Sequence, residues 1–170
     1  LTRMFALEYS YWFDYMLPGL DVRDLPIPLG GTSNHFRTAA LRELGGWDPY
    51  NVTEDADLGI RASALGYRVG VVDSTTMEEA TSRIGIFIGQ RSRWIKGYMQ
   101  TALVHARRPV RLLRNIGWRR FGAFALLIGG TPITFLGVIP FTVILIASFL
   151  VPLAELSAVF PPLVLWLCLL

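Results

Sequence analysis

Charged residues are almost entirely confined to the first 120 positions of this 170-residue chain. Of its 16 Lys and Arg and 13 Asp and Glu residues, only Glu155 follows Arg120. The nearly uncharged stretch 121–170 cannot cover the surface of a soluble domain, which excludes a fully soluble protein. Intrinsic disorder is excluded as well, because 52% of the residues are hydrophobic and 12% are aromatic. The charge pattern therefore predicts a cytosolic part, 1–120, and a membrane region, 121–170.

The membrane region is too long for one straight span. Residues 121–154 carry no charge, and as a single helix they would run about 50 Å, against about 30 Å for the hydrocarbon core. Gly129-Gly130-Thr131-Pro132 predicts a break, because glycine and proline disfavour a helix interior. We expect a span at 133–151, a turn at 152–157 and a second span beginning at about 158. The alternative is a buried hairpin in a large soluble core.

Basic residues precede the first apolar stretch. Between positions 80 and 120 every charged residue is Lys or Arg, and such flanking segments stay in the cytosol. We therefore expect an integral protein of the inner or plasma membrane, with its folded part cytoplasmic and next to anionic membrane lipids. A nucleic-acid partner is disfavoured, because the charge adjoins the span. These residues are Arg83, Arg91, Arg93, Lys96, Arg107, Arg108, Arg111, Arg114, Arg119 and Arg120.

Turn residues and the spacing of apolar residues divide the cytosolic part into predicted helices and one predicted strand. Pro18-Gly19 is expected to end the first helix, and Gly45-Gly46 the second. Val69, Val71 and Val72 alternate as in a strand. The predicted elements are helices at 1–17, 36–44, 53–65 and 84–106, and a strand at 67–73.

Thr53-Glu54-Asp55 begins the third helix, with Asp57 two positions beyond Asp55. One interpretation is purely structural: Thr53 caps the helix, and acids in the first turn favour the helix dipole. The other is catalytic. Carboxylates crowded within one turn raise the pKa of one of them, which suits a general base. The segment alone leaves both open.

The helix at 84–106 carries an arginine in an unfavourable place. At about 100° per residue, one predicted apolar stripe includes Arg91, whose guanidinium needs an anion there. That anion is either a bound diphosphate, gripped by the arginine fork, or an internal partner, Glu78 or Glu79. The adjacent arc carries Gln90, Trp94, Gly97 and Thr101, and Arg93 lies at its far edge. The stripe comprises Ile84, Ile88, Ile95, Met99 and Ala102.

In this order, the segments resemble the membrane-embedded family 2 glycosyltransferases, the cellulose, chitin and hyaluronan synthase-like group. Thr53-Glu54-Asp55 matches that family's Thr-Glu-Asp motif, and Gln90-Arg91-Ser92-Arg93-Trp94 matches its Gln-x-x-Arg-Trp motif. A glycine-containing loop precedes the motifs, and apolar helices follow them. The resemblance implies the C-terminal half of the catalytic domain, followed by transmembrane helices. It thus implies an α/β fold, a truncated GT-A-like nucleotide-sugar transferase domain.

The resemblance also implies roles for particular residues. Asp55 would be the catalytic base, within the motif that Thr53 and Glu54 complete. Gln90, Arg91, Arg93 and Trp94 would lie where donor diphosphate and acceptor meet, and Gly30, Gly31 and Thr32 would line the acceptor site. The Gly-Gly-Thr-Ser-Asn loop departs from the Cys-Gly-Ser-like segment of polysaccharide synthases. The acceptor therefore stays open among a growing polysaccharide, a glycolipid and another alcohol.

The implied activity is that of an inverting, hexosyltransferase-type glycosyltransferase using a nucleotide-sugar donor. The family's divalent metal, Mg²⁺ or Mn²⁺, would be bound upstream of this sequence, so no metal ligand is predicted within it. The chain begins at Leu1 and ends in an apolar run, so we expect an internal piece that is inactive alone. The alternative function is a non-catalytic membrane scaffold or lipid-binding subunit with a glycosyltransferase-like fold.

Overall fold

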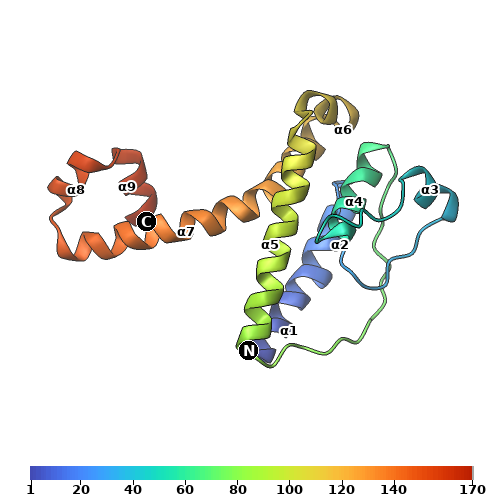
Figure 1. Cartoon of the computed structure of the whole chain (residues 1–170), viewed down its shortest axis with the longest axis horizontal. Helices are drawn as coiled ribbons and strands as arrows, with labels where there is room; N and C mark the ends of the chain where they lie inside the picture. Colours follow the sequence, from blue (N-terminus) through green and yellow to red (C-terminus); the bar gives the residue numbers. More distant parts are fainter. Residues whose placement is uncertain (170) are drawn as a thin grey trace. The chain divides into compact units, whose positions relative to one another are not determined.

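A computed structural model describes residues 1–169 of the chain (Figure 1). Contacts divide it into two units, Leu1–Thr131 and Pro132–Leu170. The elements are α1 (Thr2–Ser10), the π-helical η1 (Tyr11–Met16), α2 (Leu17–Val22), α3 (Thr38–Glu43), α4 (Glu54–Ala64), α5 (Ile84–Ala106), α6 (Pro109–Phe124), the π-helical η2 (Ala125–Gly129), α7 (Gly130–Leu150), α8 (Leu153–Val159) and α9 (Pro162–Leu169).

The predicted α/β fold is wrong, because residues 1–169 form helices and irregular segments but no strand. The expected strand at 67–73 is irregular backbone. Val69 and Val71 do pack inward, against Leu17, Leu20 and Ile27. The Val71 amide, however, donates to Asp21 Oδ2 at 2.8 Å, a side-chain acceptor in place of a neighbouring strand. Alternation of valines buries one face, but a strand also requires a backbone partner.

The first helical run continues through Pro18-Gly19, where the sequence predicted its end. η1 separates α1 from α2, and Pro18 lies in the first turn of α2. The missing proline N–H costs little at the start of a helical segment. Leu17 and Leu20 on α2 are buried with Ile27, which fixes the following loop against this run.

α4 is the central helix of the first unit, and most of its residues are buried. Ile60 packs against α6 and η2, while Leu58 packs on the opposite side, against Leu44. Gly59 has no room for a side chain, because a methyl group there would overlap the carbonyl oxygen of Ile27. This close approach holds the start of the glycine loop beside α4.

The long helix α5 has the bounds that the periodicity predicted, but it buries a different face. Ile84 and Ile88 of the predicted apolar stripe are 70% and 58% exposed, and Met99 is exposed too. The buried face instead contains Gly97 and Thr101, on the arc that carries Gln90 and Trp94. Figure 1 shows α5 running alongside the α1–α2 run.

The apolar stretch does not break at Gly129–Pro132. The chain changes from α6 through the π-helical η2 to α7, so helical backbone continues across the predicted break. One described helical run, Pro109–Leu150, is long and apolar enough to cross a membrane by length and composition. A π-helical turn shifts the hydrogen-bonding register without ending the helix. Gly129 is the last residue of η2, and Gly130 and Pro132 lie in the first turn of α7.

The second unit contains short helices where a turn was expected. α8 covers most of the predicted turn at 152–157, and α9 follows it. Ile144, Leu156 and Leu165 form a buried cluster, which links α7, α8 and α9 within this unit. Leu170, the last position of the predicted second span, lies outside the described residues.

Candidate functional site

The turn that leads into α4 is held by hydrogen bonds to α5. Asn51 is buried; its Nδ2 donates to Thr101 Oγ1 at 2.9 Å, and its Oδ1 accepts from the Thr53 amide at 3.0 Å. The Val52 amide donates to Gln100 Oε1 at 3.1 Å. The Asn51 side chain thereby fixes the backbone ahead of the Thr-Glu-Asp motif. Its partner on α5, Thr101, is 50 residues away in the sequence.

Thr53 does not cap α4, contrary to the structural interpretation of the sequence. Its side chain makes no capping hydrogen bond, and its buried hydroxyl has no hydrogen-bond partner among the described residues. The side chain instead packs onto Gly97, where an added β-carbon would lie 2.7 Å from Thr53 Cβ. Gly97 thus allows the start of α4 to approach the backbone of α5.

Asp55 lies beside the glycine loop. An added β-carbon on Gly31 would lie 3.5 Å from Asp55 Oδ2, while Oδ1 accepts from the Ala56 amide at 2.8 Å. Burial raises the pKa of Asp55, and the nearby Glu54 carboxylate adds to the effect, although the Ala56 hydrogen bond opposes it. A half-buried carboxylate with a raised pKa is better suited to accept a proton than an exposed aspartate.

Tyr98 lies on α5 near this carboxylate. Burial, with a smaller contribution from the Asp55 charge, raises the pKa of Tyr98 to about 12. The phenol therefore stays protonated at neutral pH. Nothing in the sequence motifs singled out this residue.

Asp57 is the third acid of the α4 first turn, after Glu54 and Asp55, and it faces the interior. It accepts from Arg61 Nε at 2.6 Å, and its Oδ1 lies 3.2 Å from His105 Nε2. Burial opposes its ionisation, but hydrogen bonds from His105 and Arg61 prevail and hold the pKa of Asp57 below its ordinary value. Arg61 also donates to the carbonyls of Leu44 and Gly46, at 2.5 and 2.8 Å.

The glycine loop, 30–32, lies between the first helical run and α4. An added β-carbon on Gly30 would lie 3.4 Å from the Phe13 ring of η1. The Gly30 carbonyl accepts from the Asn34 amide group. Gly31 and Thr32 are exposed to solvent. The structure therefore brings Gly31 to Asp55, whereas Thr32 has no described contact with the acidic turn.

Arg91 is paired within the chain. Its guanidinium donates to Glu8 Oε2 at 2.5 Å, so the acidic partner lies on α1 and is neither Glu78 nor Glu79. The same group stacks over the rings of Phe87 and Trp94, 4.7 and 4.2 Å from their centroids. The sequence left open a bound diphosphate or an internal acid as the anion for Arg91. An internal acid, Glu8, is the partner, so the position of Arg91 no longer requires a diphosphate.

The remaining motif residues on α5 lie on two different faces. Trp94 is half-buried, with its ring 6.5 Å from that of Tyr9. Gln90 is half-buried too, and Arg93 is exposed without an ion pair among residues 1–169. No described contact joins Gln90, Arg93 or Trp94 to Asp55.

Three buried side-chain polar atoms in the described part of the chain have no hydrogen-bond partner, and all belong to the two motifs. They are Thr53 Oγ1, Gln90 Oε1 and Arg91 Nε. Buried polar groups are usually paired, because an unmade hydrogen bond costs about 1–3 kcal/mol. All three atoms lie where α5 contacts α1 or the start of α4. Packing alone does not explain why polar atoms without partners are buried at these contacts.

The described residues do not provide a metal centre. No group of three or more His, Cys, Asp or Glu side chains lies close enough together within residues 1–169 to hold an ion. Asp55 and Asp57, although two positions apart, face different partners. A resident divalent cation does not fit this set of residues.

Sequence reasoning assigned no role to the residues that assemble the site. Asn51, Gly97, Thr101 and His105 connect α4 to α5, and none belongs to a motif. A signal for two of them was present: Gly97 and Thr101 follow Gln90 and Trp94 at helical spacing, so small or polar residues share the motif arc. In the structure this arc of α5 packs against the segment that leads into α4.

Comparison with known proteins identifies the family. A model described as glycosyl transferase family group 2 matches residues 5–170. The chain belongs to this glycosyltransferase family. No solved structure matches it.

Curated relatives of this family-2 chain include plant and bacterial proteins. "Probable glucomannan 4-beta-mannosyltransferase 10" of Arabidopsis thaliana is 34% identical over 98 residues, covering 57% of this chain and 18% of the relative. "Probable glycosyltransferase YdaM" of Bacillus subtilis (strain 168) is 30% identical over 105 residues, covering 61% and 25%. "Glucomannan 4-beta-mannosyltransferase 2" of Arabidopsis thaliana is 32% identical over 98 residues, covering 57% and 18%. The chain spans about a fifth of the length of such relatives.

Proposed function

We propose that the full protein is an inverting, hexosyltransferase-type glycosyltransferase in which Asp55 is the catalytic base. Membership of glycosyl transferase family group 2 supports the reaction class. The observation that carries the assignment of the base is the position of Asp55, half-buried, with a raised pKa, and beside Gly31 of the glycine loop. Asp57 is unsuited to the role, because His105 and Arg61 hold its carboxylate ionised and occupied.

The proposed reaction transfers one proton and one sugar. The acceptor hydroxyl gives its proton to Asp55, and its oxygen bonds to the anomeric carbon as the bond to the nucleoside diphosphate breaks. Thr53 and Glu54 complete the motif: Thr53 places the turn against Gly97, and Glu54 raises the pKa of Asp55. Arg93, exposed and unpaired in the described chain, stabilises charge on the departing diphosphate.

The substrates are a nucleotide sugar and a glycan or glycolipid acceptor. Gly30, Gly31 and Thr32 supply backbone that a sugar can approach closely, since the glycines carry no side chain. Gln90 and Trp94 are half-buried on one arc of α5 and are assigned to the acceptor. Arg91 stacks over the Trp94 ring, so a sugar would have to use the other face of the indole. Two relatives are named as glucomannan mannosyltransferases, so a nucleotide-linked mannose is the first donor to assay.

The proposed location is the cytoplasmic face of the inner or plasma membrane. The helical run Pro109–Leu150 supports a span, and the basic residues before Phe121 support a cytosolic start. A reporter fused after Arg120 should be cytoplasmic, and one fused at Glu155 should be outside. Reporters on the same side would contradict the span.

A divalent cation, Mg²⁺ or Mn²⁺, is proposed for the whole protein, on the basis of the family alone. It would neutralise charge on the donor diphosphate. Residues 1–169 lack a ligand cluster for it. No step of the reaction is therefore assigned to a metal held by this part of the chain.

Substitution of the base tests the proposal. In membranes that contain the full protein, Asp55→Asn keeps the shape of the side chain but cannot accept the proton. Sugar transfer from a radiolabelled nucleotide sugar should fall by about 10²-fold or more, while nucleotide-sugar affinity stays within about twofold. Asp73→Asn, at an exposed aspartate of the 67–83 segment, is the control. Equal turnover of the Asp55 variant and this control would contradict the assignment.

A further inference from the structure

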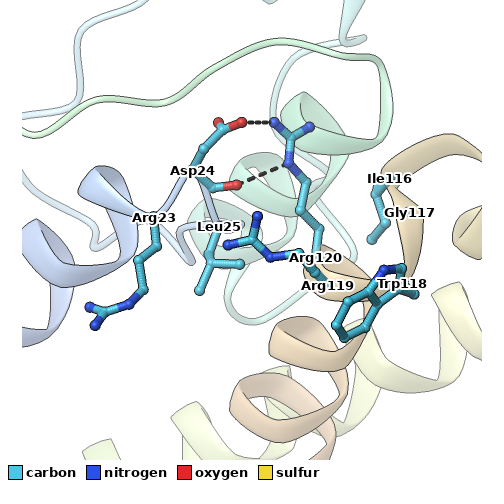
Figure 2. A pocket seen from close by; sticks show the side chains of 8 residues that line it. All are labelled: Arg23, Asp24, Leu25, Ile116, Gly117, Trp118, Arg119 and Arg120. Atoms are coloured by element: carbon cyan, nitrogen blue, oxygen red, sulfur yellow. Dashed lines mark hydrogen bonds and ion pairs between the residues drawn. The ribbon is translucent and has the colours of Figure 1, made fainter.

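A cavity of about 220 Å³ lies away from the motif residues, between the end of α2 and the second half of α6 (Figure 2). No motif residue lines it, and the proposed function assigns it no role. Its lining combines cationic and apolar side chains. The lining residues are Arg23, Asp24, Leu25, Ile116, Gly117, Trp118, Arg119 and Arg120.

The backbone of Gly117 shapes one wall of the cavity. Its φ of 78° and ψ of 165° are not helical, so α6 consists of two helical segments that meet at a kink at this residue. No atom lies within 4 Å of an added β-carbon there, so the conformation and not crowding calls for glycine. The interruption turns the segment 118–120 relative to the first part of α6. Trp118 is consequently 77% exposed, although it closely precedes the apolar stretch that begins at Phe121.

One of the three arginines is already neutralised. Arg120 Nε donates to the Asp24 carbonyl at 2.9 Å, and its terminal nitrogen pairs with the Asp24 carboxylate. Figure 2 shows both contacts, with the Arg119 guanidinium beside Leu25. Arg23 and Arg119 are exposed and have no ion pair within residues 1–169. The rim therefore carries two uncompensated positive charges, while Asp24 is occupied by Arg120.

The apolar part of the lining fits a ligand that is only partly polar. Leu25 is half-buried and Ile116 is buried. Exposed tryptophan next to an apolar helix is typical of the interfacial region of a membrane, where the indole lies at headgroup level. Arginine binds phosphate through two parallel hydrogen bonds. The pocket thus combines a cationic rim, an apolar floor and an interfacial tryptophan. This combination fits a lipid, which has both a phosphate and apolar chains, better than it fits a free anion.

We propose that this pocket binds the headgroup phosphate of an anionic membrane phospholipid, with Arg119 as the phosphate ligand and Trp118 against the glycerol and upper acyl chain. Arg23, whose guanidinium extends away from Arg119 in Figure 2, adds positive charge at the outer rim. Arg120 and Asp24 hold α2 to α6 and so form the frame of the pocket. The site anchors the end of α6 at the depth where the apolar stretch begins. It is independent of the transferase reaction and stands even if that assignment fails.

The test measures lipid binding to the full protein in detergent micelles. Fluorescently labelled phosphatidylglycerol is titrated against labelled phosphatidylcholine. Arg23→Gln combined with Arg119→Gln should weaken phosphatidylglycerol binding by about tenfold or more. Arg37→Gln combined with Arg42→Gln removes the same charge from two exposed arginines outside the cavity, and it should change binding less than about twofold.

The outcomes distinguish a specific phospholipid site from general electrostatic attraction of anionic lipid to the protein. Equal loss in both double variants would mean general electrostatics, and unchanged binding in the pocket variant would mean no site; either result overturns the proposal. Displacement of the lipid by millimolar inorganic phosphate would identify a soluble anion as the occupant and would overturn the lipid assignment. Circular dichroism and thermal unfolding check both variants. Should the pocket pair fail to fold, Arg119→Gln against Arg42→Gln makes the same comparison, with about threefold weakening expected.

Discussion

Asp57 Oδ1 lies 3.2 Å from His105 Nε2, in a buried contact that joins the first turn of α4 to the last turn of α5. Asp57 is only 4% exposed. The His105 ring also packs edge-on against Phe124 of α6, with centroids 5.5 Å apart. Since Asp55 precedes Asp57 on the same turn, this contact fixes the helix end from which the proposed base projects. The same contact predicts how the fold responds to substitution and to acid.

Asp57→Asn should strongly destabilise the first unit. The change leaves Arg61 and His105 without their anionic partner in a buried setting, and loss of one member of such a group typically costs about 3 kcal/mol or more of unfolding free energy. Denaturant unfolding in detergent, followed by circular dichroism, measures it. Asp73→Asn, at an exposed site, should change the unfolding free energy by less than about 0.5 kcal/mol. A similarly small loss for Asp57→Asn would contradict a stabilising role for this contact.

Acid should destabilise the wild type through the same carboxylate. The pKa of Asp57 is below its ordinary value of 3.8 in the folded chain, so its contribution is complete above that value. It is lost as the pH falls through the lower, folded-state pKa. Asp55 has the opposite sign, because its raised pKa makes protonation favour the folded state. The difference between wild type and Asp57→Asn therefore isolates Asp57, and this difference should shrink below about pH 4. A difference independent of pH would argue against the ion pair.

Gly97→Ala should destabilise the chain although alanine favours helices. Alanine in a helix interior normally gains about 1 kcal/mol over glycine. At Gly97, however, the added methyl would overlap Thr53, and overpacking costs about 1–3 kcal/mol. Gly89→Ala is a matched control on the same helix, because nothing lies within 4 Å of its added β-carbon. Unfolding free energies should move in opposite directions; stabilisation by both substitutions would show that α4 and α5 are not in close contact.

Glu54→Gln should move the acidic limb of the pH–rate profile. Burial and Glu54 together raise the pKa of Asp55; without the Glu54 charge the pKa falls, so the base stays ionised to lower pH. The limb of kcat/KM should then shift to lower pH, and turnover at neutral pH should change little. Glu79→Gln, an exposed acid of the 67–83 segment, is the control. If the acidic limb does not move and turnover is normal, the group that titrates in the pH–rate profile is not Asp55.

Arg93→Lys and Arg91→Lys should have different effects. Arg93 is exposed and unpaired in the described chain, so lysine should weaken nucleoside diphosphate binding by several-fold without lowering thermal stability. Arg91 pairs with Glu8 and stacks on Phe87 and Trp94, so lysine should mainly lower the unfolding temperature. Isothermal titration and thermal unfolding distinguish the two. Arg107→Lys serves as an exposed control; equal nucleotide binding by Arg93→Lys and this control would exclude Arg93 from the donor site.

Local sequence patterns determined the positions of several elements. The periodicity between 84 and 106 predicted the bounds of α5, and Glu54 begins α4 directly after Thr53, as the acidic turn indicated. The charge distribution marked where the apolar stretch begins, but the helical run that contains it starts earlier, at Pro109. These features depend on neighbours within one or two helical turns, where spacing and composition are sufficient information. The order of the two short motifs along the chain was likewise enough to indicate the glycosyltransferase family.

Tertiary structure alone decided which partners these elements have. Arg91 pairs with Glu8, 83 residues away, and not with the nearer Glu78 or Glu79. The Val71 amide binds the Asp21 carboxylate, so the predicted strand does not form. Ile84 and Ile88 of the predicted apolar stripe are exposed, and α4 packs against the other face of α5, at Gly97. Each outcome is a competition between contacts distant in sequence, and such a competition is settled only when the whole set of helices packs together.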